Sequence, residues 1–173
     1  MNLLLLSLTS LCAGISLSLL APFYPNEALA KGVSVTQSGI VTGSAFVTTI
    51  LCTPLFGKYI ETFGARWFLI VGTYIIGLGN IGFGFLDILI DSGWFFALSI
   101  VLRVFIAVGE CALIPSTFPI AQRQVSAKHH GTVIGIVEAS FGVGTMFGPS
   151  MGGFLYDSGG FSLPFGCWVA LHL

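Results

Sequence analysis

Three ionisable side chains lie well inside the apolar stretches of this sequence: Arg103, Glu110 and Glu138. In a membrane, each such side chain costs about 3 kcal/mol by insertion scales, so each needs a partner charge or water. Intramembrane carboxylates and arginines commonly relay protons or line a path for charged solutes. The residue types therefore indicate proton transfer and binding of a charged solute.

Arg103 and Glu110 are seven residues apart, which is two turns along one face of a helix. Arg103 lies about ten residues, or roughly 15 Å, inside its apolar stretch, near the middle of a bilayer. Two interpretations of Arg103 stay open: it alternates between a carboxylate and a proton or substrate, or it belongs to a static ion pair. Glu110 is about five residues from the end of its stretch, and we expect its carboxylate to reach interfacial water.

Glu138 lies about 200° around a helix from a line of small residues that includes Ser140 and Gly144. We therefore expect its carboxylate to face away from the surface that these small residues form. It either points into an aqueous cavity and takes part in proton transfer, or it neutralises a buried positive charge. We favour proton transfer, the common role of such carboxylates.

The small residues belong to a glycine-rich motif whose members are Gly144, Gly148, Pro149, Gly152 and Gly153. A spacing of four places Gly144, Gly148 and Gly152 on one helical face, where a second backbone can approach closely. Pro149 removes a backbone donor and bends the helix. Each glycine would cost a soluble helix about 1 kcal/mol relative to alanine. The motif therefore indicates a membrane helix that packs through its glycine face.

Other kinds of chemistry have little support in the sequence. It contains no nucleophile–base arrangement and no phosphate-binding glycine loop. The adjacent His129 and His130 have no further metal ligand near them. With 8% charged residues and no basic stripe, nucleic acid is not an expected partner. We expect no enzyme activity, metal or cofactor.

The elements that carry these residues are long and apolar. Hydrophobic residues make up 55% of the sequence and the mean hydropathy is +0.98, which indicates a protein embedded in the lipid bilayer. About 20 apolar residues cross a bilayer core as a helix. We predict an all-α fold with helices over residues 3–21, 37–56, 67–86, 94–114 and 131–156, and an incomplete sixth over 161–173. A signal peptide over 3–21 is the alternative, but no positive side chain precedes it.

Basic residues separate between alternate connections. Lys58, Arg66, Arg123 and Lys128 are expected on one side of the membrane, and Lys31 alone on the other. Because positive charge accumulates on the cytoplasmic side, the amino terminus and a polar loop over residues 115–130 are predicted to be cytoplasmic.

An internal repeat relates the second and fifth expected helices. A shift of 96 residues places residues 39–44 on residues 135–140, and the match continues without a gap to Gly64 and Gly160. Since three crossings separate the two helices, they run in opposite senses. The chain is therefore predicted to contain an inverted repeat of three helices plus three, the organisation of each half of a major facilitator transporter.

Two motifs strengthen that resemblance. The run from Gly144 to Gly153 resembles the antiporter motif of helix 5 in major facilitator drug and amine exchangers. Residues 57–66 are similar to the helix 2–3 motif G-x-L-A-D-R-x-G-R-K, with matches at Gly57, Gly64 and Arg66. Glu61 replaces the motif's Asp, and two basic positions are lost, which weakens the charge latch that the motif implies.

Further similarity extends over nearly the whole chain. Arg103 and Gly109 match the helix 4 motif R-x-x-x-G-x-G, although Ala107 replaces its first glycine. Residues 20–28, 31–34, 153–156 and 164–165 look most like the vesicular polyamine transporter branch of the vesicular amine transporters. Monoamine members carry an acidic residue in helix 1 and a lysine in helix 2. Both are absent here, which disfavours a monoamine substrate.

The resemblance implies the amino-terminal half of a twelve-helix antiporter that loads cationic amines into vesicles in exchange for protons. Its partners would be the small cation, protons and a carboxy-terminal half, which the glycine face of Gly144 would contact. The candidates for substrate binding or proton coupling are Glu138, Arg103, Glu110 and, as a ligand contact, Tyr24. Two alternatives stay open: a truncated, non-transporting protein that associates with other membrane proteins, and a membrane scaffold or receptor.

Overall fold

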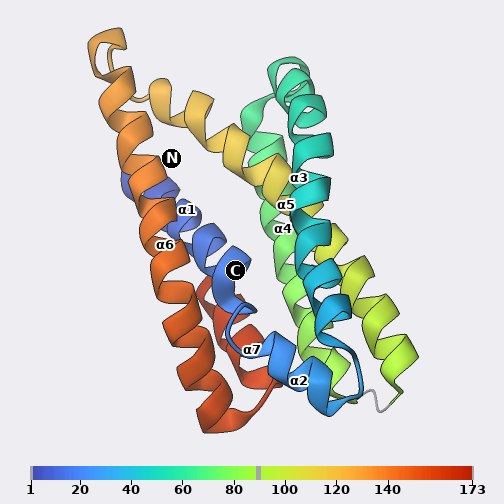
Figure 1. Cartoon of the computed structure of the whole chain (residues 1–173). Helices are drawn as coiled ribbons and strands as arrows, with labels where there is room; N and C mark the ends of the chain where they lie inside the picture. Colours follow the sequence, from blue (N-terminus) through green and yellow to red (C-terminus); the bar gives the residue numbers. More distant parts are fainter. Residues whose placement is uncertain (1, 89–90, 173) are drawn as a thin grey trace.

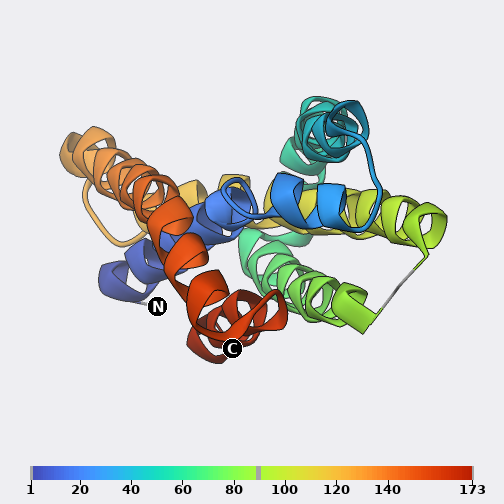
Figure 2. The ribbon, with the colours of Figure 1, turned by 60° about the horizontal axis from the view of Figure 1, so that its bottom comes forward.

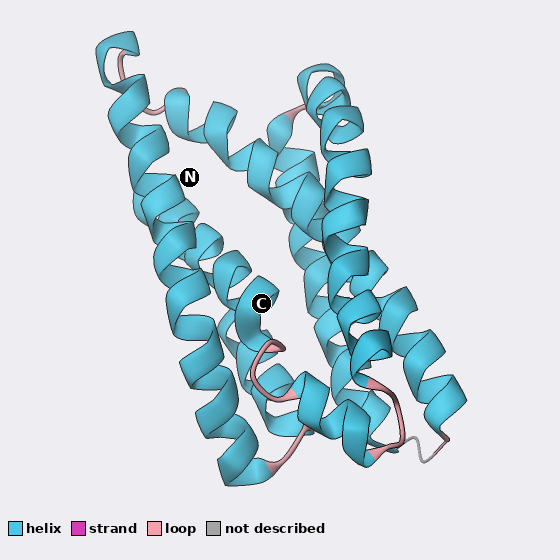
Figure 3. Cartoon of the chain, viewed as in Figure 1, coloured by secondary structure: helices cyan, strands magenta, loops and turns pink. Residues whose placement is uncertain are grey.

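The computed structural model describes residues 2–88 and 91–172 and shows a helical bundle (Figure 1; Figure 3). Five stretches are long and apolar enough to cross a membrane, which confirms the all-α, multi-pass prediction. The helices are α1 Leu3–Leu19, α2 Tyr24–Ala30, α3 Val35–Phe63, α4 Ala65–Phe85, α5 Ser92–Gln122, α6 His130–Gly159 and α7 Ser162–His172, with 3-10 turns η1 Leu86–Ile88 and η2 Ala127–His129.

The helices form two packed groups. In one, α1 lies along α6; in the other, α5 packs between α3 and α4, and α7 contacts both α4 and α6. The view from the lower end shows the two groups side by side (Figure 2). The end that carries α2, η1 and the α6–α7 turn is opposite the end that carries the α3–α4 turn and η2 (Figure 1).

The inverted repeat is visible in the helix boundaries. The shift of 96 residues maps Val35–Phe63 of α3 onto 131–159, and α6 spans His130–Gly159. Both members of the pair Val41 and Val137 are buried. In addition, α3 packs against α5, as α6 packs against α1, so the two halves of the repeat use equivalent pairings. This arrangement is the three-plus-three organisation predicted from the sequence.

The predicted loop over residues 115–130 is mostly helical, so that boundary was wrong. Helix α5 continues through Pro115 and Pro119 to Gln122. Prolines are tolerated in membrane helices because neighbouring helices and hydroxyl side chains satisfy the freed backbone groups. Packing sustains the last turns, since Ile120 is buried in a cluster with Val133 of α6. The connection proper is short and leads into η2.

Two other predicted breaks are also shorter than expected. The segment between the first two crossings contains the seven-residue helix α2. The expected loop over residues 57–66 is helical up to Phe63, and Gly64 alone reverses the chain with a φ of 95°. Glycine suits this position because side chains disfavour positive φ. Gly57 and Glu61 therefore lie on the last turns of α3, and Arg66 lies on the first turn of α4.

The glycine face of α6 packs against α1, within this half of the bundle. A Cβ atom at Gly144 would collide with the carbonyl of Leu11, and one at Gly152 with the carbonyl of Leu19. Gly14 meets α6 from the other side, at the Phe141 carbonyl. The expectation that this face contacts an external carboxy-terminal half was therefore wrong, because α1 already covers it.

Two members of the motif do not share this packing role. A Cβ atom at Gly153 would meet nothing within 4 Å, so the prediction that Gly153 packs a helix was wrong. Pro149 is half-buried, and α6 continues through it. Gly148 does pack: its face meets Ile15 and Ser18 of α1.

Candidate functional site

Arg103 joins α5 to the end of α1. The side chain is 3% exposed, and its Nη2 donates a hydrogen bond of 2.9 Å to the Leu17 carbonyl. Leu17 is in the last turn of α1, where carbonyls have no partner within the helix, and a positive charge there also complements the helix dipole. Nη1 is buried without a hydrogen-bond partner among the described residues. Nη2 of the guanidinium is therefore held by α1, whereas Nη1 can still donate a hydrogen bond to another group.

Asn80 of α4 supplies a second buried polar group, which the sequence analysis missed. It is fully buried, and its Nδ2 donates to Ser16 Oγ of α1 at 3.0 Å and to the Ile76 carbonyl at 2.9 Å. Its Oδ1 has no partner in the described part of the chain. A search for charged residues cannot find Asn80, but it is the single asparagine inside a predicted helix, and that was a usable signal.

Glu110 is buried in the middle of α5, contrary to the prediction that it reaches interfacial water. It is 3% exposed, and Oε1 has no hydrogen-bond partner among the described residues. The prediction failed because α5 runs twelve residues beyond it, to Gln122. Within the described ranges, Glu110 and Arg103 form no ion pair at 4.0 Å or less. The two residues lie seven positions apart on the same buried face of α5.

A line of buried groups leads along α5 toward Arg103. Phe95, Ser99 and Arg103 follow at intervals of four on its buried face. Tyr24 of α2 stacks on Phe95, with ring centroids 6.0 Å apart and an interplanar angle of 13°. The hydroxyls of Tyr24 and Ser99 are both buried and lie close to each other, and neither has a hydrogen bond to any other residue in the described chain. Tyr24 therefore packs against the same buried face of α5 that carries Arg103. The sequence analysis had named both residues as candidates.

A charged network surrounds Lys31 at the end of the bundle that carries α2. Its Nζ donates to the Asp87 carbonyl at 2.8 Å and lies 3.7 Å from Asp87 Oδ1 and 3.8 Å from Glu27 Oε1. The same atom is 5.2 Å from the centre of the Phe95 ring. Tyr156 of α6 donates to Glu27 Oε2 at 2.8 Å. The sequence analysis missed this network because its members come from four separate segments.

The remaining predicted residues lie apart from this line. Glu138 is exposed on α6, on the side away from α1, as its angular position predicted. Glu61 lines a groove of about 480 Å³ that also includes Arg123, at the opposite end from Lys31. Neither Glu61 nor Arg66 forms an ion pair within the described residues. No three metal-ligating side chains gather in the described part of the chain.

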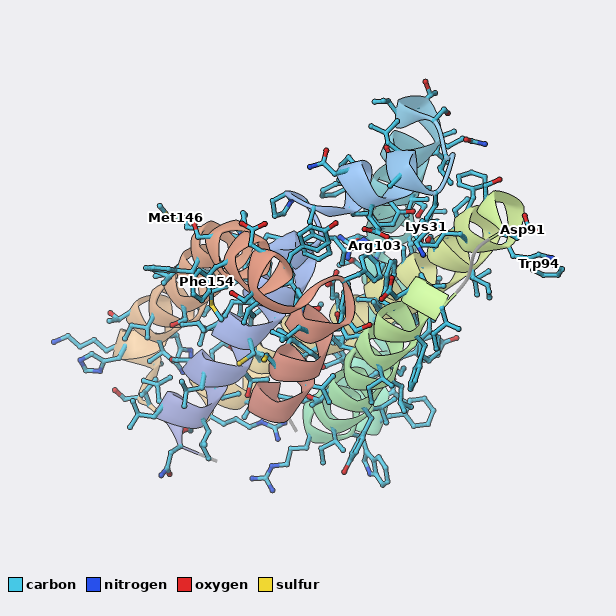
Figure 4. The ribbon with its side chains drawn as sticks, turned by 90° about the horizontal axis from the view of Figure 1, so that it is seen from below. Lys31, Asp91, Trp94, Arg103, Met146 and Phe154 are labelled. Atoms are coloured by element: carbon cyan, nitrogen blue, oxygen red, sulfur yellow. The ribbon has the colours of Figure 1, made fainter. Side chains whose placement is uncertain are left out.

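Viewed along the bundle from the α2 end, the buried line occupies the middle of the cross-section. The labelled Lys31 and Arg103 lie in the central region, whereas Trp94, Met146 and Phe154 point outward (Figure 4). We call these buried groups the central polar seam. It consists of the side chains of Arg103, Asn80, Tyr24 and Ser99, which still have hydrogen-bonding capacity that the described residues do not use. Such a seam can bind a polar or charged solute, or exchange partners when a proton arrives.

Comparisons with known proteins agree with this arrangement. The sequence profile of the Major Facilitator Superfamily matches residues 6–173. The MFS-type transporter SLC18B1 of Mus musculus is 36% identical over 159 residues, covering 90% of this chain and 34% of that protein. SLC18B1 of Homo sapiens is 36% identical over 157 residues, covering 89% of this chain and 34% of the relative. The vesicular acetylcholine transporter of Mus musculus is 26% identical over 161 residues, with 93% and 28% covered. The chain thus spans about a third of the length of the curated relatives it matches.

Proposed function

This chain belongs to the major facilitator superfamily, a family of membrane transporters rather than enzymes, and from that premise we propose that it forms the amino-terminal half of a proton-coupled antiporter. Its cargo is a small organic cation of the polyamine class, and it moves that cargo into an intracellular vesicle. The amino terminus is cytoplasmic, as the distribution of basic residues favours. Similarity to SLC18B1 and to the vesicular acetylcholine transporter supports the vesicular amine class.

The observation that carries this proposal is the partly satisfied polar seam. Buried polar atoms are hydrogen-bonded in the great majority of cases, because an unpaired one costs about 1–3 kcal/mol. The described residues nevertheless leave Arg103 Nη1, Glu110 Oε1 and the Tyr24 hydroxyl without partners. Unused donors and acceptors near the middle of a membrane-spanning bundle suit a solute or a proton that binds only for part of a cycle.

The carboxy-terminal half supplies the opposite wall of the cavity in this proposal. The two helices related by the repeat are the least buried of the five candidate spans in the described chain. In the apolar stretch of each span, 17% of the residues in α3 and 22% of those in the α6 span are buried, against 44–50% in the other three spans. Their open faces support contact with a second half. Glu138 lies on the open side of α6, and we assign it the proton-coupling role.

A non-transporting protein that associates through the glycine face has less support. That alternative needed a free glycine face on α6, but α1 packs against Gly144, Gly148 and Gly152. The transporter proposal does not depend on that face being free.

The proposal is tested by uptake into proteoliposomes that contain the full-length protein. With an acidic interior, we expect labelled spermine to accumulate and an uncoupler to stop the accumulation. A monoamine such as dopamine should compete poorly. Uptake that is insensitive to the uncoupler would rule out proton antiport, and uptake no greater than in protein-free liposomes would rule out polyamine transport.

A further inference from the structure

We propose that Glu27, Asp87 and Phe95 form a binding site for the primary ammonium group of an alkylamine, in which the Lys31 ammonium is a built-in occupant. These three residues, named here the ammonium cage, come from α2, η1 and α5. That the bound amine is also the transported cargo rests on the proposed function. Binding of an alkylammonium to the cage does not.

The cage offers each kind of group that recognises a primary ammonium. Lys31 Nζ donates a short hydrogen bond to the Asp87 carbonyl at 2.8 Å. Carboxylates of Glu27 and Asp87 lie on two sides at 3.8 and 3.7 Å, and the Phe95 ring faces the charge at 5.2 Å. An ammonium has three donors and no acceptor, so surrounding acceptors and an aromatic face match its chemistry.

The charge of the cage and the hydrogen bond from Tyr156 to Glu27 favour the binding of a cation. Two carboxylates face one ammonium, which leaves one negative charge. Tyr156 donates to Glu27 Oε2 at 2.8 Å, and this bond holds the other oxygen, Oε1, toward the ammonium. The site therefore keeps its shape when the lysine side chain leaves.

The two ion pairs between Lys31 and the cage carboxylates are long. Charge-assisted hydrogen bonds between an ammonium and a carboxylate are about 2.7–2.9 Å long, and both carboxylates lie beyond that range. The cage is also open on one side, because the Asp87 side chain is 48% exposed. A free alkylammonium can approach the two carboxylates from there.

An independent observation lies beneath the cage. The Phe95 ring stacks on Tyr24, whose hydroxyl is buried without a partner in the described chain, and Ser99 has the same unmet capacity one turn farther along α5. Arg103 follows after another turn. The orphaned hydroxyls continue the cage inward over about 12 Å, at 1.5 Å per residue from Phe95 to Arg103.

Chemical rescue of a lysine deletion tests the cage without using transport. In the full-length protein, Lys31→Ala empties the cage and should lower the Tm. We expect n-butylammonium to restore most of that loss, while tetramethylammonium at the same concentration does not, because it has no N–H donor. Lys128→Ala, at the other end of the bundle, is the matched control: it keeps the cage and Lys31, so its Tm should respond to n-butylammonium only as the wild type does. Rescue should disappear in Lys31→Ala combined with Glu27→Gln.

The same titration tests exchange with Lys31. The wild-type protein should need a higher n-butylammonium concentration for half of its Tm shift than Lys31→Ala, because the tethered lysine competes at a high effective concentration. If Lys31→Ala does not fold, Lys31→Gln replaces it in the same comparison. Equal responses to the two ammonium ions, or an equal response in Lys128→Ala, would overturn the cage. If n-butylammonium rescues Lys31→Ala but the protein does not take up spermine, the ammonium cage is supported and the proposed function is overturned. If the protein takes up spermine but n-butylammonium does not rescue Lys31→Ala, the cage is overturned and the proposed function is supported.

Discussion

Arg103 uses one guanidinium nitrogen to bond the end of α1 and leaves another buried and unpartnered. Glu110 lies seven residues farther along the same buried face of α5, outside ion-pair distance. Removing one charge of a buried pair leaves the other uncompensated, which is more costly than removing both. Arg103→Gln should therefore destabilise the protein more in the presence of Glu110 than in a Glu110→Gln background.

This coupling is measured by a double-mutant cycle on thermal unfolding in detergent. We expect an interaction energy of roughly 0.5–3 kcal/mol, the range for coupled neighbours. Strictly additive effects of the two substitutions would show that Arg103 and Glu110 act independently.

Glu138 is exposed on α6 and forms no ion pair among the described residues. Glu138→Gln should therefore leave the Tm nearly unchanged, while it removes a carboxylate that can carry a proton. We expect loss of proton-driven spermine uptake, with exchange of labelled for unlabelled spermine retained. The exposed Glu61, changed to Gln, is the matched control. Unchanged proton-driven uptake in Glu138→Gln would exclude this carboxylate from coupling.

At the scale of single residues, the sequence showed which charged side chains lie in apolar stretches, but not which groups they contact. Arg103, Glu110 and Glu138 were recognisable because a charge inside an apolar stretch is costly wherever it lies. The partners of Asn80 and of Lys31 were not recognisable, because those contacts depend on how separate segments meet. Glu110 was misplaced because its distance from interfacial water depended on where α5 ends.

At the scale of helices, the contact between α1 and α6 is made by glycines on both sides. Gly144 has no room for a Cβ atom against the Leu11 carbonyl, whereas Gly153 has open space. Gly144→Ala should separate the two helices and cost about 1–3 kcal/mol, as overpacking does. Gly153→Ala should be neutral or stabilise the helix by up to about 1 kcal/mol.

Melting of the two variants by fluorescence-detected size exclusion compares these effects directly. A Tm for Gly144→Ala that equals that of Gly153→Ala would contradict the close contact. The two substitutions add the same methyl group to the same helix, so a difference between them reports the neighbour and not helix propensity.

The partner of the glycine face could have been predicted in part. Ser10, Gly14 and Ser18 repeat at intervals of four in the first apolar stretch, and this pattern also permits close helix contact. Which two small-residue faces meet is a matter of topology, and helical periodicity does not encode it. The end of α5 was equally hard to predict, since Pro115 suggested a break and only packing around Ile120 explains its continuation.

At the scale of the whole molecule, the inverted repeat explains both the architecture and the open surfaces. The 96-residue shift predicted two equivalent helices, and α3 and α6 match it in length, pairing and low burial. The family relationship gives those open faces a use, because a second half would cover them. Sequence periodicity and composition were sufficient for the fold class. The central seam required the three-dimensional packing of α1, α2, α4 and α5.

The most direct test of proton-coupled transport is proton release from acid-loaded proteoliposomes, followed with an internal pH-sensitive dye. When spermine is added outside, the account predicts a saturable rise of internal pH in liposomes that contain the full-length protein, well above that in protein-free liposomes. Glu138→Gln should abolish the excess. A rise of internal pH that is identical with and without the protein would contradict proton-coupled amine antiport.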